Sequence, residues 1–228
     1  MIYSFLITGT SSGLGYELAR NLLLNKHKVI GISRTLGKSK EFKKNNNFKF
    51  YKYDLSNING IPQLVKNIIT EDNNINTLIN NSSKFSLSPD KKISDDKLIK
   101  IFNTNVLGTI ILTRNMMKNN PNLKKIFNIL SVSGLNSKIN QAIYSSSKHA
   151  LKGYFDSLMQ ENIDKKLIIN FYPGGMKTEL WNNKKLDSKK ISKFMDPKNV
   201  AKFILYHLTL PKDIYLKEAT FFPKNDWN

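Results

Sequence analysis

The stretch Thr8-Gly9-Thr10-Ser11-Ser12-Gly13-Leu14-Gly15 joins the apolar segment Ile2–Thr8 to a segment with leucines at helical spacing, Ser12–Asn25. The first segment predicts a buried strand and the second an amphipathic helix. Because glycine has no Cβ atom, the backbone between them can turn sharply and lie close to a pyrophosphate. The free N–H groups at the start of the helix would bind that anion. A Gly- and Ser-rich turn with a purely structural role is the alternative interpretation.

Strand-like and helix-like segments alternate along the rest of the chain. The other predicted strands are Val29–Ile32, Phe48–Tyr53, Thr77–Ile79, Lys125–Leu130, Leu167–Tyr172 and Ile214–Phe222. The other predicted helices are Ile61–Ile69, Leu98–Met117, Ala142–Gln160 and Asp196–Thr209. This order predicts a Rossmann-type, doubly wound, mostly parallel seven-stranded sheet with helices on both faces, a three-layer α/β/α fold. Ligands bind such sheets beyond the carboxyl ends of the strands, where all the motifs described below lie.

Length and composition predict one domain. The chain has 228 residues, 40% of them hydrophobic, and no linker or internal repeat is recognisable. We expect a single domain over residues 1–228, with a cofactor half at about 1–120 and a catalytic half at about 121–228. Cysteine is absent and the three histidines are scattered, so no metal site is expected. Neither a signal peptide nor a run of ~18 apolar residues is present, which predicts a soluble cytoplasmic protein with no membrane partner.

The formal net charge of +19 raises the question of nucleic-acid binding. Lysines are spread along the whole chain, and no nucleic-acid-binding module is recognisable. We therefore expect no specific nucleic-acid partner. An acidic small molecule or an acidic carrier remains compatible with the charge.

Tyr144 and Lys148 lie four residues apart, and Ser131 precedes Tyr144 by thirteen residues. In so lysine-rich a chain, about one Tyr-x-x-x-Lys pair is expected by chance. The pair becomes specific only in combination with other motifs that occur in a fixed order along the chain. These are the glycine turn, Asp54-Leu55, Asn80-Asn81, Asn105, Ser131, Tyr144, Lys148, and Pro173-Gly174 with Thr178. With its Gly-x-x-x-Gly-x-Gly turn, the chain resembles the short-chain dehydrogenases/reductases, in their short single-domain branch.

The resemblance implies an NADP(H)-dependent oxidoreductase that transfers hydride between nicotinamide and a carbonyl or alcohol substrate. Tyr144 would be the general acid/base, and Ser131 would give the substrate oxygen a second hydrogen bond, with Ser133 as the competing candidate. A free tyrosine has a pKa of about 10, which a nearby ammonium lowers. Lys148 would supply that ammonium and also bind the nicotinamide ribose.

Asn105 completes the catalytic tetrad that the resemblance implies. It would hold a water molecule that links Lys148 to solvent as a proton relay, and Asn103 is the less favoured candidate. A polar residue that kinks its helix is the alternative interpretation of Asn105.

The cofactor would contact residues from the glycine turn and from the ends of the following strands. The second strand ends in Ser33-Arg34-Thr35 without an acidic residue, and a guanidinium binds a 2′-phosphate well. We therefore expect NADP(H) to be preferred over NAD(H). The alternative interpretation is that Arg34 is a surface residue with no role in cofactor binding. The expected contacts are Gly9, Thr10, Ser11, Ser12, Gly13, Leu14, Gly15, Ser33, Arg34, Thr35, Asp54, Leu55, Asn81, Ser82, Tyr144, Lys148, Pro173, Gly174, Met176 and Thr178.

Two of these expectations have a specific qualification. Asp54 would accept a hydrogen bond from the adenine amino group, or would serve only as a turn residue. Ser82-Ser83 replaces the Ala-Gly pair that is usual in the family, which adds a Cβ atom where the backbone can require glycine and puts cofactor affinity in question.

The substrate would lie against Ser131, Tyr144, Phe85, Leu135 and Trp181, under a lid at about residues 179–195. Trp181 would be an apolar cover or an anchor for that loop. The segment Tyr215–Pro223 lacks the glycine-rich ending of the family's tetramers and is similar to carbonyl reductases related to benzil and sepiapterin reductases. The resemblance also implies a homodimer or homotetramer.

Three hypotheses follow for the function. The first is reduction of a small ketone, diketone or aldehyde with NADPH. The second is reduction of a carrier-bound acyl ketone or a nucleotide-sugar ketone, which the cationic surface favours. The third is a dinucleotide-binding regulator without turnover.

Overall fold

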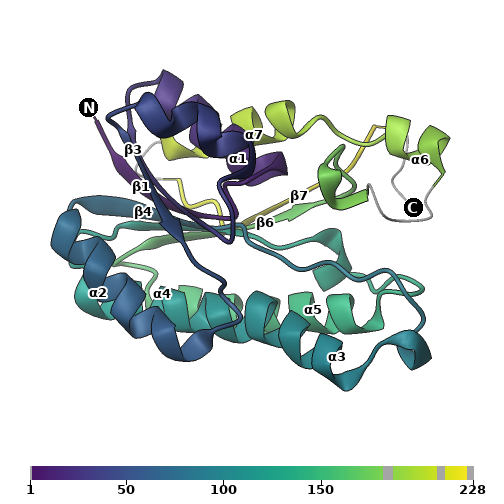
Figure 1. Ribbon diagram of the computed structural model, residues 1–228. Coiled ribbons are helices and arrows are strands. Elements are labelled where there is room, and N and C mark those ends of the chain that lie inside the picture. The colour runs from purple at the N-terminus through teal and green to yellow at the C-terminus, as the bar shows by residue number, and fades with distance from the viewer. Residues whose placement is uncertain (1, 182–186, 210–213, 225–228) are drawn as a thin grey trace.

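One parallel sheet runs through the chain and carries helices on both of its faces (Figure 1). This computed structural model describes residues 2–181, 187–209 and 214–224. The strand order is β3-β2-β1-β4-β5-β6-β7. The strands are β1 (Ser4–Thr8), β2 (Lys28–Ser33), β3 (Phe48–Lys52), β4 (Ile75–Asn80), β5 (Lys125–Ile129), β6 (Leu167–Pro173) and β7 (Glu218–Phe221). Every pairing is parallel, so the predicted fold class is confirmed.

The α-helices alternate with these strands. They are α1 (Gly13–Leu24), α2 (Ile61–Glu71), α3 (Asp95–Phe102), α4 (Gly108–Asn119), α5 (Ala142–Glu161), α6 (Ser188–Ser192) and α7 (Pro197–Tyr206). Short 3₁₀ segments lie at Gly37–Lys44, Ile58–Gly60, Asp90–Lys92, Val132–Gly134, Glu179–Trp181 and His207–Thr209. Helices α1 and α7 cover one face of the sheet, and α2, α4 and α5 cover the other (Figure 1).

Two predicted elements differ from the structure. The helix predicted at Leu98–Met117 is divided into α3 and α4 by one π-helical turn, Asn103–Leu107, a feature that apolar periodicity does not reveal. The strand predicted at Ile214–Phe222 is shortened to β7, because this edge strand pairs only with the end of β6. The 3₁₀ segment Gly37–Lys44 was not predicted, since it has no amphipathic pattern of sufficient length.

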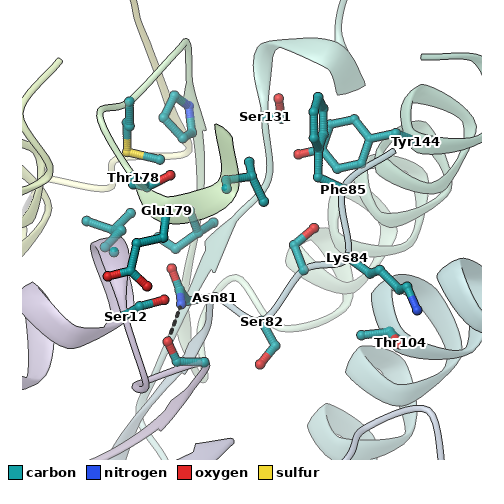
Figure 2. A pocket seen from close by; sticks show the side chains of 18 of the residues that line it. Ser12, Asn81, Ser82, Lys84, Phe85, Thr104, Ser131, Tyr144, Thr178 and Glu179 are labelled. Carbon is teal, nitrogen blue, oxygen red and sulfur yellow. Dashed lines mark hydrogen bonds between the residues drawn. The ribbon is translucent and has the colours of Figure 1, made fainter. Parts of the chain in front are cut away.

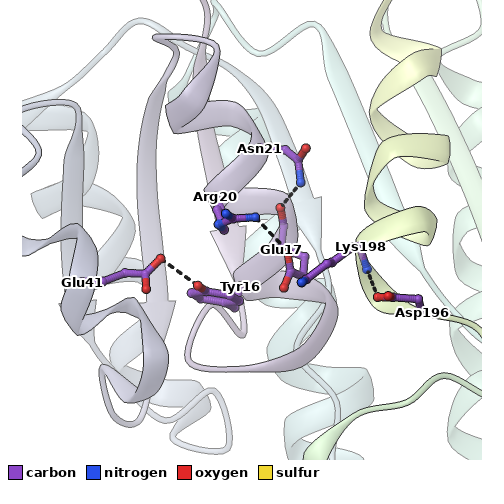
Figure 3. Close-up of polar contacts among 7 residues, drawn as sticks. All are labelled: Tyr16, Glu17, Arg20, Asn21, Glu41, Asp196 and Lys198. Atoms are coloured by element: carbon purple, nitrogen blue, oxygen red, sulfur yellow. Dashed lines mark hydrogen bonds and ion pairs between the residues drawn. The ribbon is translucent and has the colours of Figure 1, made fainter.

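Two apolar cores fix the layers. Fully buried side chains such as Phe5, Leu18 and Ile204 pack α1 and α7 onto the sheet, while Ile68 and Phe155 belong to the core on the other face. Polar contacts complete the α1 face (Figure 3). Tyr16 donates to Glu41 at 2.7 Å, which ties α1 to the segment Gly37–Lys44, and Asp196 caps α7 by accepting from the backbone N–H of Lys198 at 2.8 Å.

The sheet reverses its direction of winding between β1 and β4. Successive strands run outward from this switch point, β2 and β3 on one side and β5 to β7 on the other. Such a switch point opens a crevice at the carboxyl ends of the strands. The glycine turn after β1 and the segment 81–84 after β4 both lie there.

Candidate active site

A cavity of about 710 Å³ lies at the carboxyl edge of the sheet. Figure 2 shows side chains from both halves of the chain turned toward it. Most residues predicted for the site line this cavity: Gly9, Ser11, Ser12, Gly13, Leu14, Ser33, Arg34, Thr35, Asp54, Leu55, Asn81, Ser82, Phe85, Ser131, Tyr144, Lys148, Pro173, Gly174, Met176, Thr178 and Trp181.

The glycine turn has a conformation that side chains would oppose. Gly9 and Gly13 have φ angles of +79° and +57°, in the left-handed region that favours glycine. A Cβ atom on Gly15 would lie 2.2 Å from the carbonyl oxygen of Gly9. Helix α1 begins here with no side-chain cap from Ser12 and no acidic residue in its first turn. Its free N–H groups and positive dipole end therefore fit the pyrophosphate of a dinucleotide.

Asn81 joins the glycine turn to β4. Its side-chain amide donates to the carbonyl of Thr8 at 2.9 Å, and the backbone N–H groups of Asn81 and Ser82 both donate to the Thr8 hydroxyl at 2.9 Å. Neither Ser82 nor Ser83 has a positive φ. The backbone at these two positions therefore does not require glycine, and serine fits there without conformational strain.

The ends of β2 and β3 form the part of the cavity that lies beyond the glycine turn. Ser33 donates to the carbonyl of Thr35 at 2.9 Å, and Arg34 is exposed at the cavity wall. Asp54 accepts from the N–H and hydroxyl of Ser56 at 3.0 and 2.8 Å, so it does serve as a turn residue. Burial raises the pKa of Asp54, but these hydrogen bonds and the charge of Arg34 outweigh it, and the pKa is lowered.

Tyr144, at the start of α5, is buried and faces the end of β5. It lines the cavity together with Ser131, after β5, and Ser83, after β4. Burial raises the pKa of Tyr144, while hydrogen bonding by the Ser131 and Ser83 side chains lowers it in part. Ser133 instead donates to Gln141 at 2.9 Å. Of the two competing serines, Ser131 is thus the one placed against the tyrosine.

Lys148 is almost fully buried one helical turn after Tyr144. Its Nζ donates to the carbonyl of Ile129 at 3.2 Å and lies 5.7 Å from the centroid of the Tyr144 ring. Burial lowers the pKa of Lys148 to about 7. The expectation that Lys148 lowers the pKa of Tyr144 is not met in this state, because burial dominates for both groups.

Asn105 lies in the π-helical turn and is fully buried. Its side chain accepts from the N–H of Lys84 at 2.7 Å and donates to the Lys84 carbonyl and to Ser147, both at 3.0 Å. These partners occupy the amide, so a relay water would have to be held by backbone atoms of this turn. A π turn shifts the hydrogen-bond register and is common at functional sites.

Aromatic side chains form the wall near Tyr144. The Phe85 ring contacts those of Tyr144 and Trp181 edge to face, at centroid distances of 4.8 and 5.1 Å. Trp181 also packs on Phe194 at 5.2 Å and donates its indole N–H to the carbonyl of Met176 at 2.8 Å. Trp181 therefore both anchors its loop and lines the cavity. Within the predicted lid, residues 182–186 lie outside the described residues.

Four predicted site residues do not line the cavity. Thr10 is fully buried and accepts from Ser39 through its carbonyl, and Gly15 packs against Gly9, so both support the turn. Asn105 acts through Lys84, as described above. Leu135 was wrongly assigned to the substrate wall, since it packs against the core beneath α5.

Several lining residues were not predicted. They are Tyr53, Ser83, Lys84, Leu87, Lys100, Thr104, Ile129, Leu130, Val132, Lys138, Gln141 and Gly175, whereas Glu179, Leu180, Lys190 and Phe194 belong to the predicted lid and Ser133 was the alternative to Ser131. The position of Ser83 and Lys84 directly after Asn81 was the available signal for two of them. The others are brought in by tertiary packing that local patterns do not encode.

Two further observations concern the whole described chain. None of its helices is both long and apolar enough to cross a membrane. Across residues 2–181, 187–209 and 214–224, no three metal-binding side chains of the His, Asp or Glu type cluster together.

Comparisons with known proteins agree with this geometry. A family model described as short chain dehydrogenase matches residues 4–189. The NADP-dependent 3-hydroxy acid dehydrogenase of Schizosaccharomyces pombe is 30% identical over 97% of this chain and 93% of its own length. Benzil reductase ((S)-benzoin forming) of Bacillus cereus is 27% identical over 97% of this chain and 96% of its own length. The solved structure of 4-hydroxyisoleucine dehydrogenase complexed with NADH has a TM-score of 0.86 and 26% identity, and the match covers 97% of both chains.

The family match covers most of the chain, and it coincides with a glycine turn and a cavity that fit a nicotinamide dinucleotide. The chain therefore belongs to the short chain dehydrogenase family, and it is an NAD(P)-dependent oxidoreductase that acts on carbonyl or alcohol groups.

Proposed function

We propose that this protein is an NADPH-dependent reductase of small ketones, diketones or aldehydes, with Tyr144 as the general acid. One observation carries the proposal: Tyr144 and Ser131 line the same cavity as the glycine turn. A carbonyl oxygen that lies against both hydroxyls would be polarised by two donors. The relatives named above include reductases and dehydrogenases of such groups, which supports the proposal.

The residues of this chain would divide the work as follows. A bound nicotinamide would supply the hydride for the carbonyl carbon, and Tyr144 would give its proton to the carbonyl oxygen. Ser131 would donate a hydrogen bond to that oxygen. The hydride and the proton together would convert the carbonyl into a neutral alcohol. Lys148, with its pKa lowered by burial to about 7, can give up or take up a proton near neutral pH and so return one toward Tyr144. Asn105 keeps Lys84 and the start of α5 in place.

The preference for NADPH is part of the proposal. It rests on Arg34, which lines the cavity at the end of β2, and on the absence of an acidic residue in Ser33-Arg34-Thr35. A guanidinium favours a 2′-phosphate, whereas an NAD site usually has a carboxylate there. Lys84 and Lys100 also line the cavity and add positive charge near Asp54.

The test is the loss of NADPH absorbance with benzil, diacetyl and a series of small aldehydes, run beside NADH. Turnover that is faster with NADPH supports the proposal, and the Tyr144→Phe variant should abolish it while it retains NADPH binding. Turnover that persists in Tyr144→Phe would exclude Tyr144 as the general acid.

A second candidate is reduction of an anionic, carrier-bound or nucleotide-linked ketone. The observation in its favour is that Lys138 and Lys190, from the catalytic half and the lid, are exposed and line the same cavity. Attraction to an anionic group at such exposed charges is screened by salt. A KM that rises steeply with ionic strength for an acyl-thioester ketone, but not for diacetyl, would favour this candidate.

We also propose that residues 1–228 act as one domain and that the chain forms a homodimer or homotetramer. The apolar cores described above span both halves of the chain, which supports the first statement. Light scattering of the purified protein tests the second, and a monomer at micromolar concentration would contradict it.

A further inference from the structure

Ser133 and Gln141 form a hydrogen-bonded pair in the wall of the cavity. The Ser133 hydroxyl donates to Oε1 of Gln141 at 2.9 Å, and both residues line the cavity. Ser131 and Tyr144 lie together at one end of the same cavity (Figure 2). Neither member of the pair takes part in the proton transfer proposed for Tyr144, so the pair has no function assigned to it so far.

The backbone around Ser133 is closely packed. Its N–H donates to Oγ of Ser131 at 3.1 Å, and its side chain is almost fully buried. A Cβ atom on the next residue, Gly134, would lie 3.1 Å from the Cβ atom and from the carbonyl oxygen of Lys148. The 3₁₀ segment that carries Ser133 therefore lies directly against α5, which fixes the Ser133 hydroxyl relative to that helix.

Gln141 lies at the start of the same helix. Its backbone carbonyl accepts from the N–H of Ser145 at 2.7 Å, which ties Gln141 to the first turn of α5. Residues three apart at a helix end lie on the same side of the helix. Gln141 and Tyr144 are three residues apart, and both line the cavity. A ligand that reaches the tyrosine therefore lies beside the glutamine as well.

The direction of the Ser133 hydrogen bond determines what Gln141 offers to a ligand. A carboxamide has an oxygen that accepts and an NH₂ group that donates. Because Oε1 accepts from Ser133, the NH₂ group is left to donate, and no described residue accepts a hydrogen bond from it. Similarly, Oγ of Ser131 accepts from the N–H of Ser133, which leaves the Ser131 hydroxyl proton to donate. Gln141 thus adds a donor to those of Ser131 and Tyr144.

We propose that Gln141 is a specificity-determining residue, whose NH₂ group binds a second oxygen next to the carbonyl that is reduced, and that Ser133 is the positioning residue that orients it. The substrate class is then a ketone with a neighbouring acceptor oxygen, of which a vicinal diketone is the simplest member. This inference rests on the proposed function, in which the reacting carbonyl lies against Ser131 and Tyr144. It narrows that function, because a ketone with one oxygen would leave the donor of Gln141 unpaired, and a site with an unpaired polar group discriminates against such a ligand.

The first test compares kcat/KM for diacetyl and for butanone, two ketones of nearly equal size, each with NADPH. The second carbonyl of diacetyl also makes it more reactive toward hydride, so the informative quantity is the change of the diacetyl-to-butanone ratio on substitution. Gln141→Met keeps the length of the side chain but removes the donor. Gln141→Glu keeps the acceptor for Ser133 and replaces the NH₂ group by a second acceptor. Loss of one hydrogen bond should lower the ratio about three- to tenfold in both variants.

The matched control is Gln160→Met, which changes an exposed glutamine on the same helix and should leave the ratio unchanged. Circular dichroism melting of each variant checks that it is folded. If Gln141→Met is unfolded, Gln141→Glu decides, because it retains the contact with Ser133. A ratio in the folded Gln141 variants equal to that of the unchanged protein would overturn the inference.

The second test concerns Ser133 as the residue that orients the amide. Ser133→Ala should lower the ratio about two- to threefold, since the donor is retained but no longer held. In the Gln141→Met background, Ser133→Ala should have no further effect on the ratio, because the group that it orients is gone. A purely structural effect would instead lower kcat/KM equally for both ketones, and that result would exclude the positioning role.

The two possible failures are distinguishable. If the unchanged protein reduces neither ketone nor any other carbonyl compound with NADPH, the proposed function is refuted, and this inference with it. If reduction takes place and depends on Tyr144, but the ratio does not respond to substitution of Gln141, only this inference is refuted.

Discussion

The Nζ atom of Lys148 lies 5.7 Å from the centroid of the Tyr144 ring, and it donates to the carbonyl of Ile129 at 3.2 Å. In this state the lysine is thus held by backbone rather than by the phenol. Burial has opposite effects on the two groups, since it raises the pKa of Tyr144 and lowers the pKa of Lys148 to about 7. Both shifts favour the neutral forms.

The buried lysine should cost stability in a pH-dependent way. Between about pH 7 and pH 10.5, Lys148 binds a proton in the unfolded chain but not in the folded protein. The free energy of unfolding therefore rises with pH across this window, and below it the contribution is constant. We expect Lys148→Met to be inactive but more stable at pH 7, by roughly 1–3 kcal/mol.

This advantage should shrink toward zero as the pH rises above about 10.5, where the lysine is neutral in both states. Urea unfolding of both proteins at several pH values measures it. Parallel stability curves for the two proteins would contradict the account of Lys148.

Arg34 should decide between the two nicotinamide cofactors. Arg34→Ala removes a charge-assisted contact to a 2′-phosphate, so the Kd for NADPH should rise about tenfold while that for NADH changes little. Fluorescence titration measures both constants. Arg20→Ala is the matched control, because Arg20 lies on the outer side of α1 and faces Glu17 (Figure 3). Equal losses for NADPH and NADH in Arg34→Ala would argue against 2′-phosphate recognition.

Two glycine-to-alanine changes should have opposite effects. In Gly15→Ala the new Cβ would lie 2.2 Å from the Gly9 carbonyl oxygen and 2.5 Å from Asn81 Nδ2, so the turn must move. We expect a destabilisation of about 1–3 kcal/mol and loss of NADPH binding. Gly153, exposed on α5, has no atom within 4 Å of an added Cβ, and Gly153→Ala should stabilise by about 0.5–1 kcal/mol. Thermal melting and NADPH titration compare them, and intact binding in Gly15→Ala would contradict the close approach.

An ion pair lies beside the cavity, since one of its members, Glu179, lines it. Lys38, in the segment after β2, lies 2.9 Å from Glu179, in the segment after β6, and Figure 2 shows Glu179 close to Ser12. Both side chains are about half exposed, so the pair should contribute only about 0.2–1 kcal/mol. Lys38→Ala should therefore speed NADPH release about 1.5- to fivefold at low salt, and less at high salt.

Stopped-flow displacement measures this release rate. Lys40→Ala, an exposed lysine in the same 3₁₀ segment, is the control and should release NADPH at the unchanged rate. An equal effect of both substitutions would indicate a general loss of positive charge rather than the ion pair.

The parts of the site that depend on local sequence were predictable. The glycine turn, the Ser33-Arg34-Thr35 end of β2 and the Tyr144/Lys148 pair each follow from a short pattern, and the strand–helix alternation fixed their common edge of the sheet. Asn105 shows the limit. The pattern located it, but its partners Lys84 and Ser147 lie 21 and 42 residues away, and no periodicity encodes such contacts.

Leu135 shows a different limit. It was expected to contact the substrate, yet the chain after Ser131 turns through a short 3₁₀ segment, and Leu135 is partly buried against the core rather than lining the cavity. Ser83 was considered only as an obstacle to the backbone. Its place in the cavity wall depends on the pairing of β4 with β5, which brings the ends of these two strands together at one edge of the sheet.

The central claim is that Tyr144 delivers the proton in an NADPH-dependent reduction. Its most direct measurement is single-turnover loss of NADPH absorbance with benzil or diacetyl, for the unchanged protein and for Tyr144→Phe at equal cofactor saturation. The account predicts a rate at least ~100-fold lower in Tyr144→Phe, with the Kd for NADPH changed less than about threefold. A Tyr144→Phe rate within a factor of about three of the unchanged protein would contradict it.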